Sequence, residues 1–164
     1  MSELYTDGGV IGINPSGIGG TYAYCLIEDD KIILSDAGVI IPNSGNRITN
    51  NHSEFTAALM GLEALPDGWS GNLCSDSQVT LGRLRSDWKL NNVPCEWVTR
   101  ARNALARLGK VIPVLIQGHP TKQELNRGMG NRGYPVSKWN VYCDHECNRV
   151  AKEYMKVHEV KQCH

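Results

Sequence analysis

The order of hydrophobic patterns along the chain constrains its fold more than any other feature. Three strand-like segments come first, joined by short loops: one closes at Tyr5–Asp7, and the others are Thr21–Glu28 and Lys31–Ile41. Strands joined by tight loops predict an antiparallel meander. Helical patterns then alternate with two further strands, Ser70–Asp76 and Lys110–Gln117. The sequence therefore predicts an α/β fold: a five-stranded mixed sheet, an antiparallel meander plus parallel strands, with helices on both faces.

Helical patterns fill most of the remaining chain. A first helix is expected after caps at Thr49–Asn51, where apolar residues begin to recur at helical spacing. A second helix begins directly after Asp76, a third spans residues 94–108, and the last spans about 138–158. The segment after His119 is rich in glycine and proline, which predicts a long loop before the last helix.

The size and composition of the chain fit one domain. Its 164 residues are 41% hydrophobic, enough for a sizeable core, so we expect a single domain over residues 1–164. No apolar run is long enough to span a bilayer and nothing resembles a signal peptide. We therefore expect a cytoplasmic protein without membrane contact, and a monomer. The six cysteines then predict reduced thiols rather than disulfides.

Charge gives only a weak indication of the partner. Basic and acidic side chains number 17 each, and this balance is mild evidence against a nucleic-acid-binding protein. The stretch from Arg83 to Arg107 is nevertheless net basic. Such a stretch suits either a nucleic-acid surface or ordinary solvated helix faces, and composition leaves both interpretations open.

Four carboxylates fall at the ends of the predicted elements. Asp7 closes the first strand in "LYTDGG", and Asp76 closes the fourth in "LCSDSQ". Glu54 lies in the first turn of its helix and Asp144 opens the last helix, both on stripes that face the sheet. Inward carboxylates are costly unless they are paired or bind a metal, and ligands gather at strand ends in such sheets. Together the four predict a site for divalent ions such as Mg²⁺ that suits phosphoryl chemistry.

Each carboxylate taken alone also has a purely structural interpretation. Asp7 followed by Gly8 is a common turn signal. Glu54 and Asp144 would be favourable acids near helix N-termini, and Asp76 would cap the helix that follows it. Metal binding accounts for all four positions at once, whereas the structural interpretation needs four independent coincidences.

From Leu4 to about Tyr154 the chain resembles ribonuclease H of the type 1 family, with all motifs in the family's order. The matching segments are "YTDGG", "NPSGIGGTYAYCLI", "ITNNHSEFTAALMGLEAL", "SDSQ", "IQGH" and "NVYCDHECNRVAKE". Three features differ: Asn14 lies one residue further from Asp7 than in the family, the family's basic, tryptophan-rich segment is reduced to "LRSDWKLNNVPCEW", and the loop from His119 to Asn140 is longer. The resemblance implies a ribonuclease H-like fold and hydrolysis of the RNA strand of RNA/DNA hybrids.

The resemblance also implies roles for individual residues. Asp7, Glu54, Asp76 and Asp144 would be the catalytic, metal-binding carboxylates, and His119 would assist proton transfer or product release. The side chains implied to contact the hybrid or to lie near the metals are Asn14, Thr49, Asn50, Asn51, Gln78 and Asn140.

The expected mechanism uses two Mg²⁺ ions, or Mn²⁺ in their place, and leaves a 5′-phosphate and a 3′-hydroxyl. Backbone groups around Gly8 and Gly9 carry no side chains and are suited to reach the RNA 2′-hydroxyl. Two alternatives remain open. One is another nuclease of the same fold, such as a junction resolvase or an exonuclease. The other is a catalytically silent nucleic-acid-binding module.

Overall fold

A five-stranded mixed sheet forms the centre of the structure, as the sequence predicts. The computed structural model describes residues 2–85 and 95–162, with only the backbone described over 159–162. The strands are β1 (Glu3–Val10), β2 (Gly20–Glu28), β3 (Lys31–Ile40), β4 (Gly71–Ser75) and β5 (Val111–Leu115). Their order across the sheet is β3-β2-β1-β4-β5. β1, β2 and β3 pair antiparallel, whereas β1, β4 and β5 are parallel.

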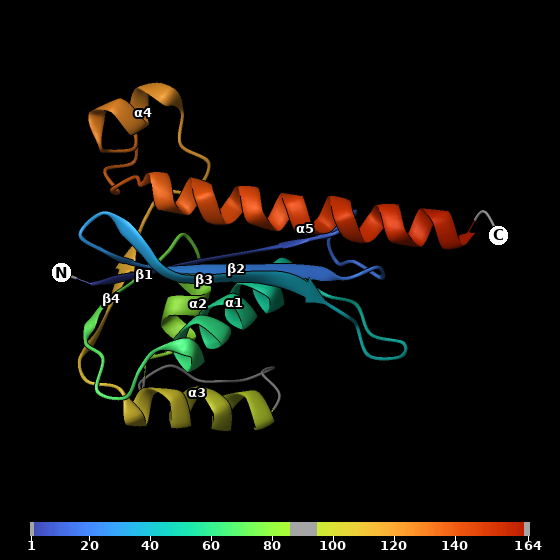
Figure 1. The fold of residues 1–164 in the computed structure, drawn as a ribbon, viewed down its shortest axis with the longest axis horizontal. Helices are drawn as coiled ribbons and strands as arrows, with labels where there is room; N and C mark the ends of the chain where they lie inside the picture. The colour runs from blue at the N-terminus through green and yellow to red at the C-terminus, as the bar shows by residue number, and fades with distance from the viewer. Residues whose placement is uncertain (1, 86–94, 163–164) are drawn as a thin grey trace.

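Helices cover both faces of this sheet. They are α1 (Asn50–Ala64), α2 (Gln78–Arg83), α3 (Cys95–Arg107), α4 (Lys122–Arg127) and α5 (Lys138–Gln162). Figure 1 shows α5 lying along one face, with α1, α2 and α3 on the opposite face. The short helix α4 stands apart from these layers, near the N-terminal end of α5 (Figure 1).

Alternation along the strands creates a separate core on each face. Leu4 of β1 packs toward the first three helices, together with Leu62 of α1. Tyr5, the next residue, packs toward α5 and joins Cys143 and Cys147. Because successive strand residues point to opposite faces, Asp7 lies on the same face as Tyr5.

The predicted thiols are free wherever the structure describes them. The cysteines without a disulfide are Cys25, Cys74, Cys95, Cys143 and Cys147. Four of these five are buried, and the Sγ atoms of Cys25 and Cys143 lie 3.7 Å apart between β2 and α5. The four buried cysteines therefore act as small apolar core residues.

The expectation that the first strand ends at Asp7 is wrong. β1 continues to Val10, and Gly8 and Gly9 pair with Tyr22 and Thr21 of β2 instead of forming a turn. An Asp-Gly-Gly sequence reads as a turn locally, but an antiparallel partner was available to extend the strand.

Three helix expectations also need correction. α1 begins at Asn50 and α5 at Lys138, as predicted, but Glu54 lies just beyond the first turn of α1. Asp144 is the seventh residue of α5, nearly two turns from its start, rather than the residue that opens it. The segment after His119 contains α4 rather than loop alone. The predicted start of the third helix at residue 94 lies outside the described residues.

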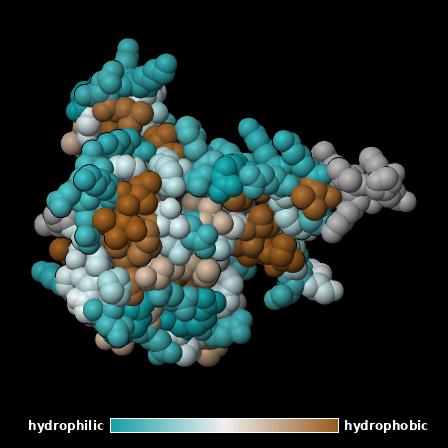
Figure 2. Space-filling view, viewed as in Figure 1, coloured by the Kyte–Doolittle hydropathy of each residue, from teal (hydrophilic) through white to brown (hydrophobic). Residues whose placement is uncertain are grey.

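The surface of the molecule is mainly polar. On the face seen in Figure 2, hydrophobic residues form separate patches between hydrophilic ones. Within residues 2–85 and 95–162, none of the helices has the length and apolar composition needed to cross a membrane.

Candidate active site

Two parallel strands bring Asp7 and Asp76 to the same level of the sheet. β1 pairs with β4 only near its start, and Tyr5 with Cys74 is the last pair. Each aspartate lies two residues beyond that pair, where the two strands part. Asp7 is still paired with Ala23 of β2, which fixes its position. The end of the parallel pairing therefore sets the site: Asp76 directly follows the last residue of β4, and Asp7 lies inside β1, beyond its last pair with β4.

Gly8 allows α1 to approach closely enough to add Glu54. A Cβ atom on Gly8 would lie 2.4 Å from the carbonyl carbon of Ser53, so any side chain there would push the helix away. The helix thus rests on the backbone of β1, and its Glu54 lies beside Asp7. The sequence predicts that Gly8 leaves the backbone bare for RNA, but in the structure its missing side chain accommodates α1.

Asp7, Glu54 and Asp76 form a cluster in which one carboxylate oxygen of each lies within 4.8 Å of the others. Burial raises the pKa of Asp7 well above its ordinary value, and the Asp76 and Asp144 charges raise it further. Burial also raises the pKa of Glu54, with Asp7 and Asp76 acting in the same direction. The pKa of Asp76 is raised by burial too, although the nearby His119 opposes the rise. The fold therefore holds three carboxylates where they repel one another.

This cluster fits a hard divalent cation. Glu54 Oε2 is buried and has no hydrogen-bond partner within the part of the chain that the structure describes. An unpaired buried carboxylate oxygen is costly, and a bound cation would remove both that cost and the mutual repulsion. Carboxylate oxygens are the ligands that Mg²⁺ takes in proteins. The residues that could hold the ion are Asp7, Glu54 and Asp76.

Asp144 and His119 lie next to this cluster rather than within it. Cys147 of α5 donates a hydrogen bond to the Asp7 carbonyl oxygen (Sγ to O, 3.5 Å), which ties the helix to β1. Asp144, about one turn earlier, is close enough to raise the pKa values of Asp7 and Asp76. The His119 side chain is 81% exposed, and its Nδ1 lies 3.8 Å from Asp144 Oδ2. The structure thus brings all five expected catalytic residues to one end of the sheet.

Four of the expected hybrid contacts gather at the N-terminus of α1. Asn14 Oδ1 accepts a hydrogen bond from the Asn50 backbone N at 3.1 Å, which links the β1–β2 loop to the helix. Thr49 is the N-cap and accepts from the His52 backbone N. Asn51 follows in the first turn, and all four expected contacts are exposed. They form one polar surface on the sheet end that carries the cluster.

Gln78 and Asn140 lie elsewhere. Gln78 is exposed at the start of α2, directly after the strand end that carries Asp76. Asn140 is only 2% exposed, and its presence beside Asp76 lowers the pKa of that carboxyl. Asn140 is therefore placed to orient the cluster, whereas Gln78 is open to a ligand.

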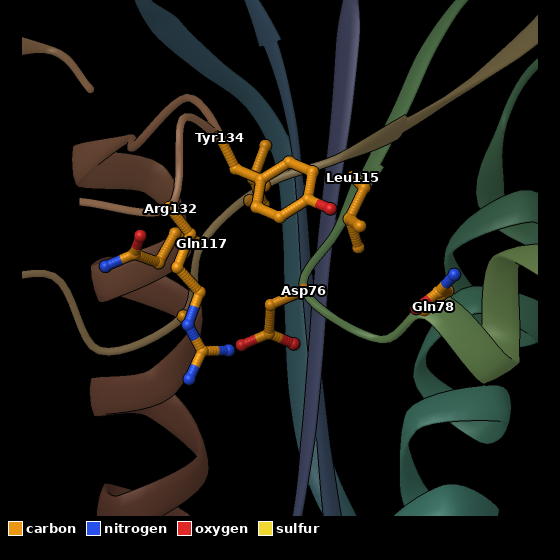
Figure 3. Close-up of a pocket in the computed structure, with 8 residues that line it drawn as sticks. Asp76, Gln78, Leu115, Gln117, Arg132 and Tyr134 are labelled. Carbon is orange, nitrogen blue, oxygen red and sulfur yellow. The ribbon is translucent and has the colours of Figure 1, made fainter. Parts of the chain in front are cut away.

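A cleft of about 560 Å³ opens beside Asp76, and the sequence analysis did not predict it. Its lining residues are Asp76, Gln78, Leu115, Ile116, Gln117, Gly118, Arg132 and Tyr134. Figure 3 shows the Arg132 guanidinium turned toward the Asp76 carboxylate, with Gln78 on the opposite side of that aspartate. A Cβ atom at Gly118 would lie 2.1 Å from Asp76 Oδ2, so a side chain there would displace the Asp76 carboxylate. The only signal in the sequence for Arg132 and Tyr134 was the extra length of their loop.

A ribonuclease H (RNase H) family model matches residues 1–131. Ribonuclease H of Syntrophus aciditrophicus (strain SB) is 36% identical over 100 residues, which are 60% of this chain and 52% of that protein. Ribonuclease H of Solibacter usitatus (strain Ellin6076) is 28% identical over 159 residues, which are 94% of this chain and 97% of that protein.

The fold is similar to that of solved ribonuclease H domains. The crystal structure of LC11-RNase H1 in complex with an RNA/DNA hybrid superposes with a TM-score of 0.65 and 16% sequence identity. The match covers 94% of this chain and 99% of the other. It therefore includes most of α5, a helix that lies wholly beyond the segment that the family model matches.

Proposed function

This chain belongs to the ribonuclease H family, and on that premise we propose that it is an endonuclease that hydrolyses the RNA strand of RNA/DNA hybrids. The observation that carries the proposal is the convergence of Asp7, Glu54 and Asp76 within 4.8 Å, where the parallel pairing of β1 and β4 ends and α1 meets β1. The complex of LC11-RNase H1 with a hybrid supports the choice of substrate.

In this proposal the carboxylates hold two Mg²⁺ ions, for which Mn²⁺ is a substitute. Asp7, Glu54 and Asp76 supply oxygens from the cluster, and Asp144 adds a fourth carboxylate from α5. When bound, such ions activate water and stabilise charge on the leaving oxygen, which yields a 5′-phosphate and a 3′-hydroxyl.

The remaining roles follow from where the side chains lie. His119 is exposed beside Asp144, so it can move a proton between the site and solvent. The polar surface at the start of α1, with Asn14 against it, is suited to hydrogen-bond the edges and sugars of a hybrid in its minor groove. Gln78 would contact the same duplex near Asp76, and Asn140 would keep the Asp76 carboxylate oriented. The backbone at Gly8 and Gly9 remains a proposed contact to the RNA 2′-hydroxyl.

A cleavage assay on four substrates tests this function. Labelled RNA/DNA hybrid, double-stranded RNA, double-stranded DNA and a four-way junction are incubated with the protein, with and without Mg²⁺. We expect cleavage of the RNA strand of the hybrid alone, and only with the ion present. Asp76→Asn should abolish it, whereas Asp29→Asn, the same chemical change in the exposed β2–β3 turn, should not.

The other outcomes separate the alternatives. Cleavage of the junction or of DNA would identify another nuclease of this fold. Binding of the hybrid without cleavage in either Mg²⁺ or Mn²⁺ would identify a silent binding module. Both results would refute the proposed function.

A further inference from the structure

The inserted segment between β5 and α5 is organised around one buried carboxylate. Glu124 is only 3% exposed and forms a capping box with Thr121 at the start of α4. Its Oε2 also accepts hydrogen bonds from Gln117 Nε2, at the end of β5, and from the Asn131 backbone N at 2.8 Å. Glu124 thus ties three points of the insertion together, so the segment has a defined shape next to the sheet.

This arrangement holds Arg132 and Tyr134 over the cleft beside Asp76. Arg132 directly follows Asn131, whose backbone is fixed by Glu124. The Gln117 backbone N donates to the Pro135 carbonyl oxygen at 2.9 Å, which fixes the other side of the same turn. Figure 3 shows the Tyr134 ring and the Arg132 guanidinium lying on the side of the cleft opposite Gln78.

The charge of Arg132 has no partner among the residues that the structure describes. In residues 2–85 and 95–162, its guanidinium makes neither a hydrogen bond nor an ion pair. Arg127 in the same insertion, by contrast, donates to the Met129 carbonyl oxygen and to Asn131 Oδ1. A free arginine that faces a cleft ending at a proposed metal ligand is placed to bind an anion that reaches that ligand. Among biological anions, phosphate matches the planar fork of a guanidinium.

We propose that Arg132 and Tyr134 form a subsite for the cleaved strand, in which Arg132 binds a phosphate next to the scissile one. This inference rests on the proposed function. Because the cleft begins at Asp76, the strand that enters it is the one whose phosphate lies at the carboxylate cluster. The volume of about 560 Å³ is sufficient for a nucleotide, and the Tyr134 ring, 43% exposed, offers a face for its sugar or base.

The test measures cleavage of a hybrid by the full-length chain in Mg²⁺ as salt is raised from about 50 to about 200 mM. Arg132→Gln removes the charge from the cleft. Lys122→Gln is the matched control, because it removes one charge from an exposed residue of the same insertion that does not line the cleft. Thermal unfolding confirms that both variants fold.

We expect Arg132→Gln to lower kcat/KM about tenfold through KM, with kcat changed less than about twofold. The slope of log(kcat/KM) against log[salt] should become shallower by about 0.7–0.9, as for the loss of one phosphate contact. Arg132→Lys should restore the slope and part of the KM, and Lys122→Gln should leave both near wild type.

Three results would overturn the inference while the proposed function stands: an unchanged salt slope in Arg132→Gln, equal effects of Lys122→Gln, or a loss confined to kcat. In each case the wild-type protein still cleaves the hybrid and Asp76→Asn does not. If the wild-type protein cleaves no hybrid, the proposed function itself fails, and the two failures are thereby distinguished.

Discussion

The molecule buries carboxylates in two places, and it treats them in opposite ways. In the inserted segment, Glu124 is surrounded by donors, and the backbone N–H groups of Thr121 and Asn131 lower its pKa to about 2. At the end of the sheet, burial and neighbouring carboxylates raise the pKa values of Asp7 and Glu54, and Glu54 Oε2 has no donor within the described residues.

The difference separates a structural carboxylate from a functional one. A charge that receives two or three hydrogen bonds is stabilised as an anion and holds the chain around it. Like charges that are buried close together destabilise the folded state, and such clusters are typical of functional sites. We therefore assign a structural role to Glu124 and a functional role to the carboxylate cluster.

The substitution expected to have the largest effect on activity is Asp7→Asn. We expect the variant to lose hybrid cleavage by about a thousandfold or more, because a metal ligand contributes several kcal/mol to transition-state stabilisation. Without divalent ions the same variant should unfold at a higher temperature than wild type, because one repelling charge is gone. Activity is measured as kcat/KM in Mg²⁺ and stability by calorimetry in a chelator. A variant that is less stable without metal and still active would refute the assignment of Asp7.

The next largest effect is expected from Gly8→Ala, which tests whether the cluster depends on the approach of α1. The new Cβ atom would meet the Ser53 carbonyl carbon at 2.4 Å, so α1 must shift, at a cost of about 1–3 kcal/mol. Glu54 moves with the helix, and we expect kcat/KM to fall together with the free energy of unfolding. Gly17→Ala is the control, since a Cβ atom there meets nothing within 4 Å. Equal effects of the two substitutions would show that α1 has room to spare.

The pH dependence of stability distinguishes the two sites, because raised pKa values at the cluster and the lowered pKa of Glu124 change the free energy of unfolding with pH in opposite directions. The raised pKa values of Asp7, Glu54 and Asp76 mean that the folded state binds more protons than the unfolded one. Their contribution to stability is then present below about pH 4, and it is lost as the pH rises toward neutrality. In a chelator, denaturant unfolding should therefore show stability falling as the pH rises above about 4. Saturating Mg²⁺ should remove that fall; if the fall persists, the cluster does not bind the ion.

The smallest effect is expected from Glu124→Gln. Since the pKa of Glu124 is lowered to about 2, its contribution to stability is present above about pH 4 and is lost as the pH falls toward 2. We expect the variant to lower the melting temperature slightly at neutral pH and to speed amide hydrogen exchange in α4, with a higher KM because Arg132 is held less firmly. Exchange that is unchanged in α4 would show that Glu124 does not hold the insertion.

Much of this architecture could be predicted from the sequence, because strand and helix patterns are local. The placement of Asp7 and Asp76 on two parallel strands followed from that pattern once the order of elements was set, although β1 continues beyond Asp7. The role of Gly8 could not be predicted, because it depends on the backbone of Ser53 in a helix that comes much later. The sequence Asp-Gly-Gly is the same whether the glycines form a turn or lie in a strand against which a helix packs, so the local pattern does not distinguish the two.

The insertion was missed for a different reason. "TKQELNRG" carries a capping signal at Thr121 and Glu124 and a terminating glycine at Gly128, and all three act as such in the structure. However, the helix between them has only six residues, too few to show a hydrophobic period. The glycine- and proline-rich residues around this helix therefore predicted a loop. Arg132, which depends on that helix for its position, could not be assigned a role without it.

The order of the strands also determines when the site is completed as the chain is synthesised. β2 follows β1 directly in the sequence, so these two strands can pair early. The other neighbour of β1 in the sheet, β4, is synthesised only after α1. Asp7 and Glu54 can thus meet early, whereas Asp76 joins later and α5, with Asp144, comes last. Contacts between distant segments form slowly because the chain between them must first be ordered. A growing chain therefore carries an incomplete carboxylate set until α5 has emerged and docked, and we expect no hybrid cleavage before that point.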